Sequence, residues 1–185
     1  METNSPRTNR YISAYITSPN FFSVRECNQI INLSEFKTFK EDNNLITKSF
    51  TALTKKHWLK EKLNALINHT NQTYYDFDIS IIKELNLLEF KKDSIIDWHI
   101  DIGPGLAATR KICFFTFLSE NNNYEGGSIN FCLNKSEKEY NEKEYIEQNI
   151  GTTVLIPAYK PYIFEKITKG TNFILNGYMH GNSFS

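Results

Sequence analysis

The sequence has few cysteines, and their spacing fits neither a cross-linked nor a zinc-bound scaffold. The three cysteines are Cys27, Cys113 and Cys132, and no two of them have Cys-x-x-Cys spacing. This odd count argues against the disulfide framework of a small secreted domain, and the spacing against a zinc knuckle. Cys113 and Cys132 lie in apolar runs, so we expect both to be buried thiols.

The sequence also lacks an excess of charge of either sign. Lys and Arg together number 21, as do Asp and Glu, so the formal net charge is zero. Without a basic surface field to attract phosphates, nucleic acid is not an expected partner. There is no run of about 18 apolar residues to predict a membrane span. The N-terminal METNSPRTNR lacks the apolar stretch of a signal peptide, so we expect a cytoplasmic protein.

The remaining composition is that of one globular domain. The chain has 185 residues, of which 40% are hydrophobic and 14% aromatic, enough to bury a core. We take residues 1–20 as an N-terminal tail and lead-in, and residues 21–185 as the domain. Apolar residues recur at helical spacing in 23–34, where Ser23 is placed to cap the first turn, and again in 57–69.

After about residue 74 the apolar period changes to the alternation of half-buried strands. The expected strands are 77–81, 84–90, 94–99, 111–118, 128–133, 152–156, 162–167 and 173–179. Turn-forming residues such as Gly, Pro and Asn separate several of them. Helices followed by many short strands predict a mainly β fold, a β-sandwich or jelly roll supported by N-terminal helices.

The segment 97–101, DWHID, carries the clearest chemical signal. His99 and Asp101 are two apart on an expected strand, so their side chains point to the same face. An imidazole nitrogen and a carboxylate oxygen are two of the three ligands of the facial triad that holds ferrous iron. Taken alone, the pair also fits a surface hydrogen bond.

With this motif, six further segments make the chain resemble the 2-oxoglutarate/Fe(II)-dependent oxygenase superfamily, near its prolyl-4-hydroxylase-like branch. The segments run in order along the chain: 20–27, 97–101, 110–119, 124–128, 151–157, 168–171 and 177–181. The resemblance implies a double-stranded β-helix, also called a cupin-like jelly roll. It further implies Fe(II) and 2-oxoglutarate as cofactors, and hydroxylation as the reaction.

Three positions depart from the family pattern. Aligned without gaps from Pro157 to Gly170, Tyr162 stands where the family has its distal metal histidine. Asn172 stands where an Arg or Lys pairs with the far carboxylate of 2-oxoglutarate. Phe90 is nearest to a tyrosine whose hydroxyl helps to hold that carboxylate. The resemblance thus implies His99, Asp101 and Tyr162 as the metal ligands.

Other residues are candidates around this centre. Arg110 is the candidate to supply the missing positive charge, with a structural salt bridge as the alternative. Trp98, Tyr159, Tyr178 and His180 are candidates to line a substrate pocket, although the aromatic ones also fit core packing. His180 is less favoured as the lost metal ligand, because eight residues of strand, roughly 26 Å, separate it from Asn172.

Three functions remain open on the sequence alone. The first is an oxygenase that hydroxylates a small-molecule or peptide substrate. The second is a catalytically degenerate jelly roll that serves as a binding or interaction module, because Asn172 cannot form the charge-assisted pair worth about 1.5–3 kcal/mol per bond. The third is a repurposed metalloenzyme that does not use 2-oxoglutarate in the usual pose.

Overall fold

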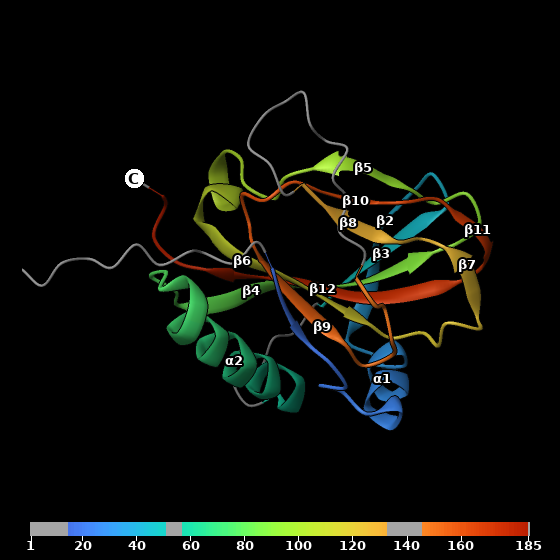
Figure 1. Ribbon diagram of the computed structural model, residues 1–185, viewed down its shortest axis with the longest axis horizontal. Helices are drawn as coiled ribbons and strands as arrows, with labels where there is room; N and C mark the ends of the chain where they lie inside the picture. Colours follow the sequence, from blue (N-terminus) through green and yellow to red (C-terminus); the bar gives the residue numbers. More distant parts are fainter. Residues whose placement is uncertain (1–14, 51–56, 133–145, 185) are drawn as a thin grey trace, which may run out of the picture.

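A seven-stranded antiparallel sheet forms the centre of the protein (Figure 1). The computed structural model describes residues 15–50, 57–132 and 146–184. In order across the sheet, the strands are β1 (Ile16–Ser18), β9 (Thr153–Pro157), β6 (Arg110–Phe117), β12 (Asn172–His180), β4 (Ile81–Phe90), β3 (Leu45–Phe50) and β2 (Phe36–Asp42).

Other elements cover the two faces of this sheet (Figure 1). A three-stranded sheet lies over one face, in the order β5 (Ile96–His99), β10 (Tyr162–Phe164) and β8 (Ile129–Phe131). The pair β7 (Tyr124–Gly126) and β11 (Ile167–Gly170) lies at one end of the molecule. Helices α1 (Val24–Ile31) and α2 (Trp58–Thr70) cover the other face. This arrangement confirms the predicted jelly roll with supporting helices.

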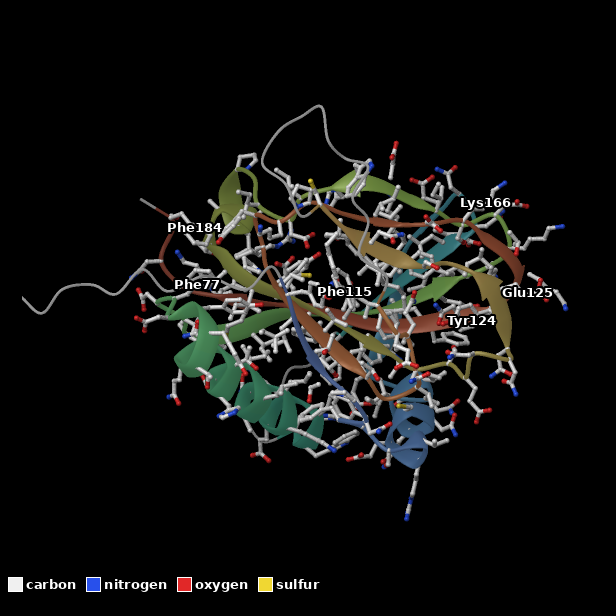
Figure 2. All side chains as sticks on the ribbon, in the orientation of Figure 1. Phe77, Phe115, Tyr124, Glu125, Lys166 and Phe184 are labelled. Carbon is white, nitrogen blue, oxygen red and sulfur yellow. The ribbon has the colours of Figure 1, made fainter. Side chains whose placement is uncertain are left out.

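Strand alternation divides the interior into two apolar layers. Along β6, Ile112 and Phe114 join the cluster beneath the helices, whereas Cys113, Phe115 and Phe117 join the cluster between the two sheets. Phe115 lies near the centre of the molecule (Figure 2). Because both faces of β6 are covered, seven of its eight residues are buried. All three cysteines are buried, as predicted for Cys113 and Cys132.

The helices agree well with the sequence, but some strands do not. Ser23 caps α1 through a reciprocal pair of hydrogen bonds with Glu26, as in a capping box. The strand predicted at 77–81 is wrong, because regular pairing begins only at Ile81. The strand predicted at 162–167 is two strands, β10 and β11, which belong to different sheets.

The hairpin of β2 and β3 and the short strand β1 were not predicted. Six of the seven residues of β2 are exposed, so main-chain pairing at the sheet edge, and not an apolar pattern, holds it. Asn43 and Asn44 both have positive φ, as a two-residue hairpin turn requires. This Asn-Asn pair was the one feature of the sequence that could have indicated the hairpin. Within the described residues, no helix is long and apolar enough to span a membrane.

An ionic network joins β4, β6 and β12 at one end of the large sheet. Arg110 donates from Nε to Glu84 Oε2 at 2.8 Å and from Nη2 to Glu84 Oε1 at 2.5 Å. The fully buried His180 lies between Glu84, at 3.1 Å, and the Thr109 hydroxyl, at 2.8 Å. Burial would raise the pKa of Glu84, but the hydrogen bonds from His180 and Arg110 outweigh it and bring the pKa to about 2.

Because the pKa of Glu84 is lower in the folded state than its ordinary 4.5, the network stabilises the protein fully above that value. This stabilisation is lost as the pH falls from 4.5 towards 2. We expect Glu84→Gln to lower the free energy of unfolding at neutral pH by about 1–3 kcal/mol. It should also flatten the acid dependence, measured by urea unfolding at a series of pH values. The exposed Glu120→Gln is the control, and an equally flat profile for both variants would contradict the assignment.

Gly151 lets the segment before α1 pass close to the start of β9. Its φ is +81°, and a Cβ atom there would collide with the carbonyl oxygen of Phe22, whose N–H donates to Gly151 O at 3.0 Å. Gly105 also has a positive φ, of +65°, but open space around the position of a Cβ atom. The two glycines therefore separate the cost of the backbone conformation from the cost of a clash.

We expect Gly105→Ala to lower the free energy of unfolding by about 1 kcal/mol, the cost of a left-handed backbone. Gly151→Ala should cost clearly more, because the chain must also move away from Phe22. Chemical denaturation of both variants measures the difference. Equal losses would mean that the close approach of Phe22 to Gly151 does not exist in solution.

Candidate functional site

Asp101 stands at the centre of the candidate site, just beyond the end of β5. Its N–H donates to Ala158 O at 3.0 Å, and its own carbonyl oxygen accepts from Arg110 Nη1 at 3.0 Å. These main-chain bonds fix the residue, and its side chain, only 1% exposed, lies in the space between the two sheets. The sequence thus buries a carboxylate in an otherwise apolar layer.

The Asp101 carboxylate is shared between the two sheets. Its Oδ1 accepts hydrogen bonds from the Tyr162 hydroxyl on β10, at 3.2 Å, and from the Tyr178 hydroxyl on β12, at 3.0 Å. Its Oδ2 is buried and has no hydrogen-bond partner within the described residues. The carboxylate therefore has one oxygen with two donors and one oxygen with none.

The pairing of β5 with β10 brings the three predicted metal ligands together. His99 is the register partner of Tyr162, and their rings are 5.8 Å apart. His99 Nε2 lies 3.5 Å from Asp101 Oδ1, and 54% of the His99 side chain is exposed. The imidazole thus stands at the solvent side of the buried carboxylate.

Both tyrosines are held as neutral phenols. Burial, and then the charge of Asp101, raise the pKa of Tyr162 well above its usual range. Burial also raises the pKa of Tyr178, with Cys113 and Asp101 as further causes. A neutral phenol that donates to a carboxylate offers a metal no anionic ligand. Of the residues that the structure describes, no three His, Cys, Asp or Glu side chains could hold a metal together.

The positions implied for 2-oxoglutarate lie at the other end of the same layer. Asn172 and Phe90 are register partners on β12 and β4, and each is 1% exposed. Asn172 Oδ1 is buried and finds no partner among the described residues. Neither side chain carries a positive charge to meet a carboxylate.

A row of aromatic rings separates these two residues from Asp101. Ring centroids are 5.0 Å apart for Tyr162 and Phe115, 5.2 Å for Phe115 and Phe164, and 5.2 Å for Phe164 and Phe90. The rings pack edge-on or tilted, as buried aromatic clusters do. A cosubstrate reaching from Asp101 to Asn172 would have to displace them, so the residues present do not fit ferrous iron with 2-oxoglutarate in its usual pose.

Arg110 lies away from this row. It pairs with His180 in the β6–β12 register, eight residues and roughly 26 Å of strand from Asn172. Its guanidinium group forms the salt bridge with Glu84 and lies 3.8 Å from the centroid of the Tyr178 ring. Arg110 thus forms a salt bridge, as in the alternative interpretation, and it lies far along the strand from Asn172.

A pocket of about 280 Å³ opens beside Asp101. It is lined by Leu45, Thr47, Asn86, Leu88, Ile96, His99, Asp101, Phe115, Tyr162, Asn176 and Tyr178. A second cavity of about 310 Å³ shares Thr47, Asn86 and Tyr178 with it and reaches Lys83, Glu84 and Arg110. Asn86 and Asn176 were not predicted to line the site, although an Asn inside the apolar run of each strand, β4 and β12, was a usable signal.

Three residues proposed for a substrate pocket do not line this one. Tyr159 packs against Phe77 and Phe184 at one end of the molecule, where Figure 2 labels both phenylalanines. His180 belongs to the network with Glu84. Trp98 precedes His99 on β5, so alternation directs the two side chains to opposite faces. Of the four, only Tyr178 contributes to the pocket.

Comparisons with known proteins identify the fold. No protein-family model and no curated protein matches the sequence. A Pseudomonas putida prolyl-4-hydroxylase matches the structure with a TM-score of 0.68 at 12% identity, over 92% of this chain and 94% of that one.

Two further solved structures give the same result. A collagen prolyl hydroxylase of Paramecium Bursaria Chlorella virus-1, in complex with 2-oxoglutarate, has a TM-score of 0.67 at 14% identity over 92% and 97% of the two chains. HygX of Streptomyces hygroscopicus, with nickel, 2-oxoglutarate and hygromycin B bound, has a TM-score of 0.70 at 13% identity over 94% and 85%. At such identities the likeness concerns the fold, so the chain has the fold of the 2-oxoglutarate/Fe(II) oxygenases.

Proposed function

We propose that this chain uses the oxygenase fold as a binding module, holding a small organic ligand in the pocket beside Asp101. In this proposal it does not hydroxylate a substrate with iron and 2-oxoglutarate. The observation that carries the proposal is the state of Asp101, whose Oδ1 already accepts hydrogen bonds from Tyr162 and Tyr178. A metal bound through Oδ1 would have to replace these two hydrogen bonds, which leaves Oδ2 as the one carboxylate oxygen without a donor among the described residues.

The chemistry of the donors supports this interpretation. Hydrogen bonds to a charged carboxylate contribute about 1.5–3 kcal/mol each. A metal bound through Asp101 Oδ1 and His99 would have to replace two of them, while gaining only two ligands from the protein. A third ligand would require Tyr162 to lose its proton, against burial and the charge of Asp101.

The cosubstrate end supports the same conclusion. A dicarboxylate buried beside Asn172 and Phe90 would leave one charge without a partner, which is costly in an apolar interior. It would also have to displace the packed rings of Phe115 and Phe164. To bind in its usual pose, 2-oxoglutarate would have to bury an unpaired charge and displace these rings at the same time.

What remains is a small pocket with a few polar groups on mostly apolar walls. This is the general composition of small-molecule sites, and about 280 Å³ is near the lower end of their size range. The size favours a ligand smaller than most drugs. The proposed function is therefore recognition of a small metabolite or of one side chain of a peptide.

One observation favours a second candidate, a metalloenzyme that does not use 2-oxoglutarate. His99 Nε2 and Asp101 Oδ1 lie only 3.5 Å apart, and His99 is accessible to solvent. Two ligands of a facial triad are thus in reach of each other. This candidate requires measurable affinity of the unmodified protein for a divalent metal.

We expect anaerobic titration of the wild-type protein with Fe(II) and 2-oxoglutarate to give no visible charge-transfer band, because iron would have only His99 and Asp101 as ligands and Asn172 would leave the far carboxylate of 2-oxoglutarate unpaired. The measurement is the visible absorption spectrum at saturating concentrations of both. A band that saturates with 2-oxoglutarate would refute the binding-module proposal. Tight Fe(II) binding without such a band would select the metalloenzyme.

We expect Tyr162→His to raise the affinity for Mn(II) by at least about tenfold, because it supplies a third ligand, a second neutral imidazole nitrogen, beside His99 and Asp101. The matched control is Tyr178→Phe, which removes the other hydroxyl from the same carboxylate oxygen and adds no ligand. Electron paramagnetic resonance measures free and bound Mn(II). Equal affinities of the two variants would mean that Tyr162 is not at the distal ligand position.

A further inference from the structure

We infer that the ligand of this pocket is a small organic ammonium ion, and that its charged group binds Asp101 Oδ2. The inference rests on the proposed binding function and adds the chemical class of the ligand. It follows from the unpaired, buried Oδ2 atom of Asp101, from the aromatic side chains that line the pocket, and from the negative charge of the Asp101 carboxylate.

The first observation is that Asp101 Oδ2 has no donor although it is buried. The atom has no hydrogen-bond partner within the described residues, and the side chain is 1% exposed. Buried polar atoms are normally satisfied, and a buried charge is normally paired. An unpaired carboxylate oxygen in a pocket wall is therefore a site for a group that brings hydrogen and positive charge.

The second observation is that the nearby donors are already in use. The hydroxyl groups of Tyr162 and Tyr178 both point to Oδ1. Arg110, the nearest guanidinium, binds Glu84 with two nitrogens and the main-chain oxygen of Asp101 with the third. His99 Nε2 is 3.5 Å from Oδ1, at the limit of a hydrogen bond. The buried Cys113 thiol also lies near the Asp101 carboxylate, but a thiol is a weak donor. These contacts leave Oδ2 without a strong donor, and we assign it to a ligand.

The third observation is the aromatic surface beside the carboxylate. The rings of Phe115 and Tyr162, with centroids 5.0 Å apart, line the pocket together with Tyr178. Aromatic faces attract organic cations, and the Arg110 guanidinium already lies 3.8 Å from the centroid of the Tyr178 ring. A carboxylate among aromatic rings suits an alkylammonium group, whose carbon chain also gains from apolar contact.

The fourth observation concerns the length and charge of the ligand. The adjoining cavity shares Thr47, Asn86 and Tyr178 with this pocket, so a chain attached to the ammonium group would extend along these three residues. The carboxylate of Asp101 lines this pocket, and an anionic ligand would be repelled by it. We therefore expect a linear primary amine, and not a carboxylic acid, to bind.

The test is isothermal titration calorimetry of the full chain with n-butylammonium, n-butanol and butyrate as probes. We expect saturable binding of n-butylammonium, and binding of the two other probes at least about tenfold weaker, because they lack the charged donor. Asp101→Asn should weaken n-butylammonium binding by at least about tenfold, since it keeps an acceptor for the tyrosines and removes the charge.

The matched control is Asp97→Asn, which removes the same charge from β5 at an exposed residue that does not line the pocket. This variant should bind n-butylammonium as the wild type does, and circular dichroism checks that both variants are folded. If Asp101→Asn does not fold, the relative affinities of the wild-type protein for the three probes still test whether the pocket prefers an ammonium ion.

Each other outcome overturns a different statement. Binding of n-butanol or butyrate as tight as that of n-butylammonium would overturn the ammonium inference and leave the binding module standing. No binding of n-butylammonium would overturn the inference as well. Displacement of n-butylammonium by stoichiometric Mn(II) would assign Oδ2 to a metal, and a charge-transfer band with Fe(II) and 2-oxoglutarate would overturn the proposed function itself.

Discussion

The hydrogen bonds that place the buried Asp101 carboxylate between Tyr162 and Tyr178 are the interaction on which the site depends. Burying a charge in an apolar layer is costly, and donors from both sheets offset that cost. The same contacts join β10 of the small sheet to β12 of the large one. The hydrogen bonds that shape the pocket therefore also link the two sheets, beside the apolar cluster packed between them.

The departures from the oxygenase pattern are consistent with one another. If Tyr162 takes the place of the distal histidine, as we propose, its hydroxyl donates to the carboxylate at the position of that ligand. At the far end of the layer, Phe90 and Asn172 offer no positive charge to pair with a cosubstrate carboxylate. The packed rings of Phe115 and Phe164 lie between that end and Asp101. In the proposed alignment, each change removes a requirement of the iron and 2-oxoglutarate chemistry, while the overall fold is kept.

Local patterns in the sequence were sufficient for part of this description. Alternation placed His99 and Asp101 on one face, and a count from Pro157 put Tyr162 beside them, which the β5–β10 register agrees with. The Ser23 cap was visible because its partner lies three residues away. Such features depend on neighbours in the chain, so the sequence alone could indicate them.

Features that depend on distant partners could not be found in this way. Arg110 binds Glu84, which lies 26 residues earlier in the chain. The sequence around either residue does not indicate that the other is its partner. The aromatic row joins three strands, β10, β6 and β4, and each ring alone looks like ordinary core. The β2–β3 hairpin lacks an apolar period because its outer strand is exposed. Tertiary pairing decided all three.

The most direct test of the central claim is a crystal structure of the wild-type protein soaked in excess Mn(II), with anomalous diffraction data. We expect no anomalous peak between His99 and Asp101, and both tyrosine hydroxyl groups within hydrogen-bond distance of the Asp101 carboxylate. A peak at about 2.0–2.2 Å from His99 Nε2 and a carboxylate oxygen of Asp101, with Tyr162 turned away, would contradict the account.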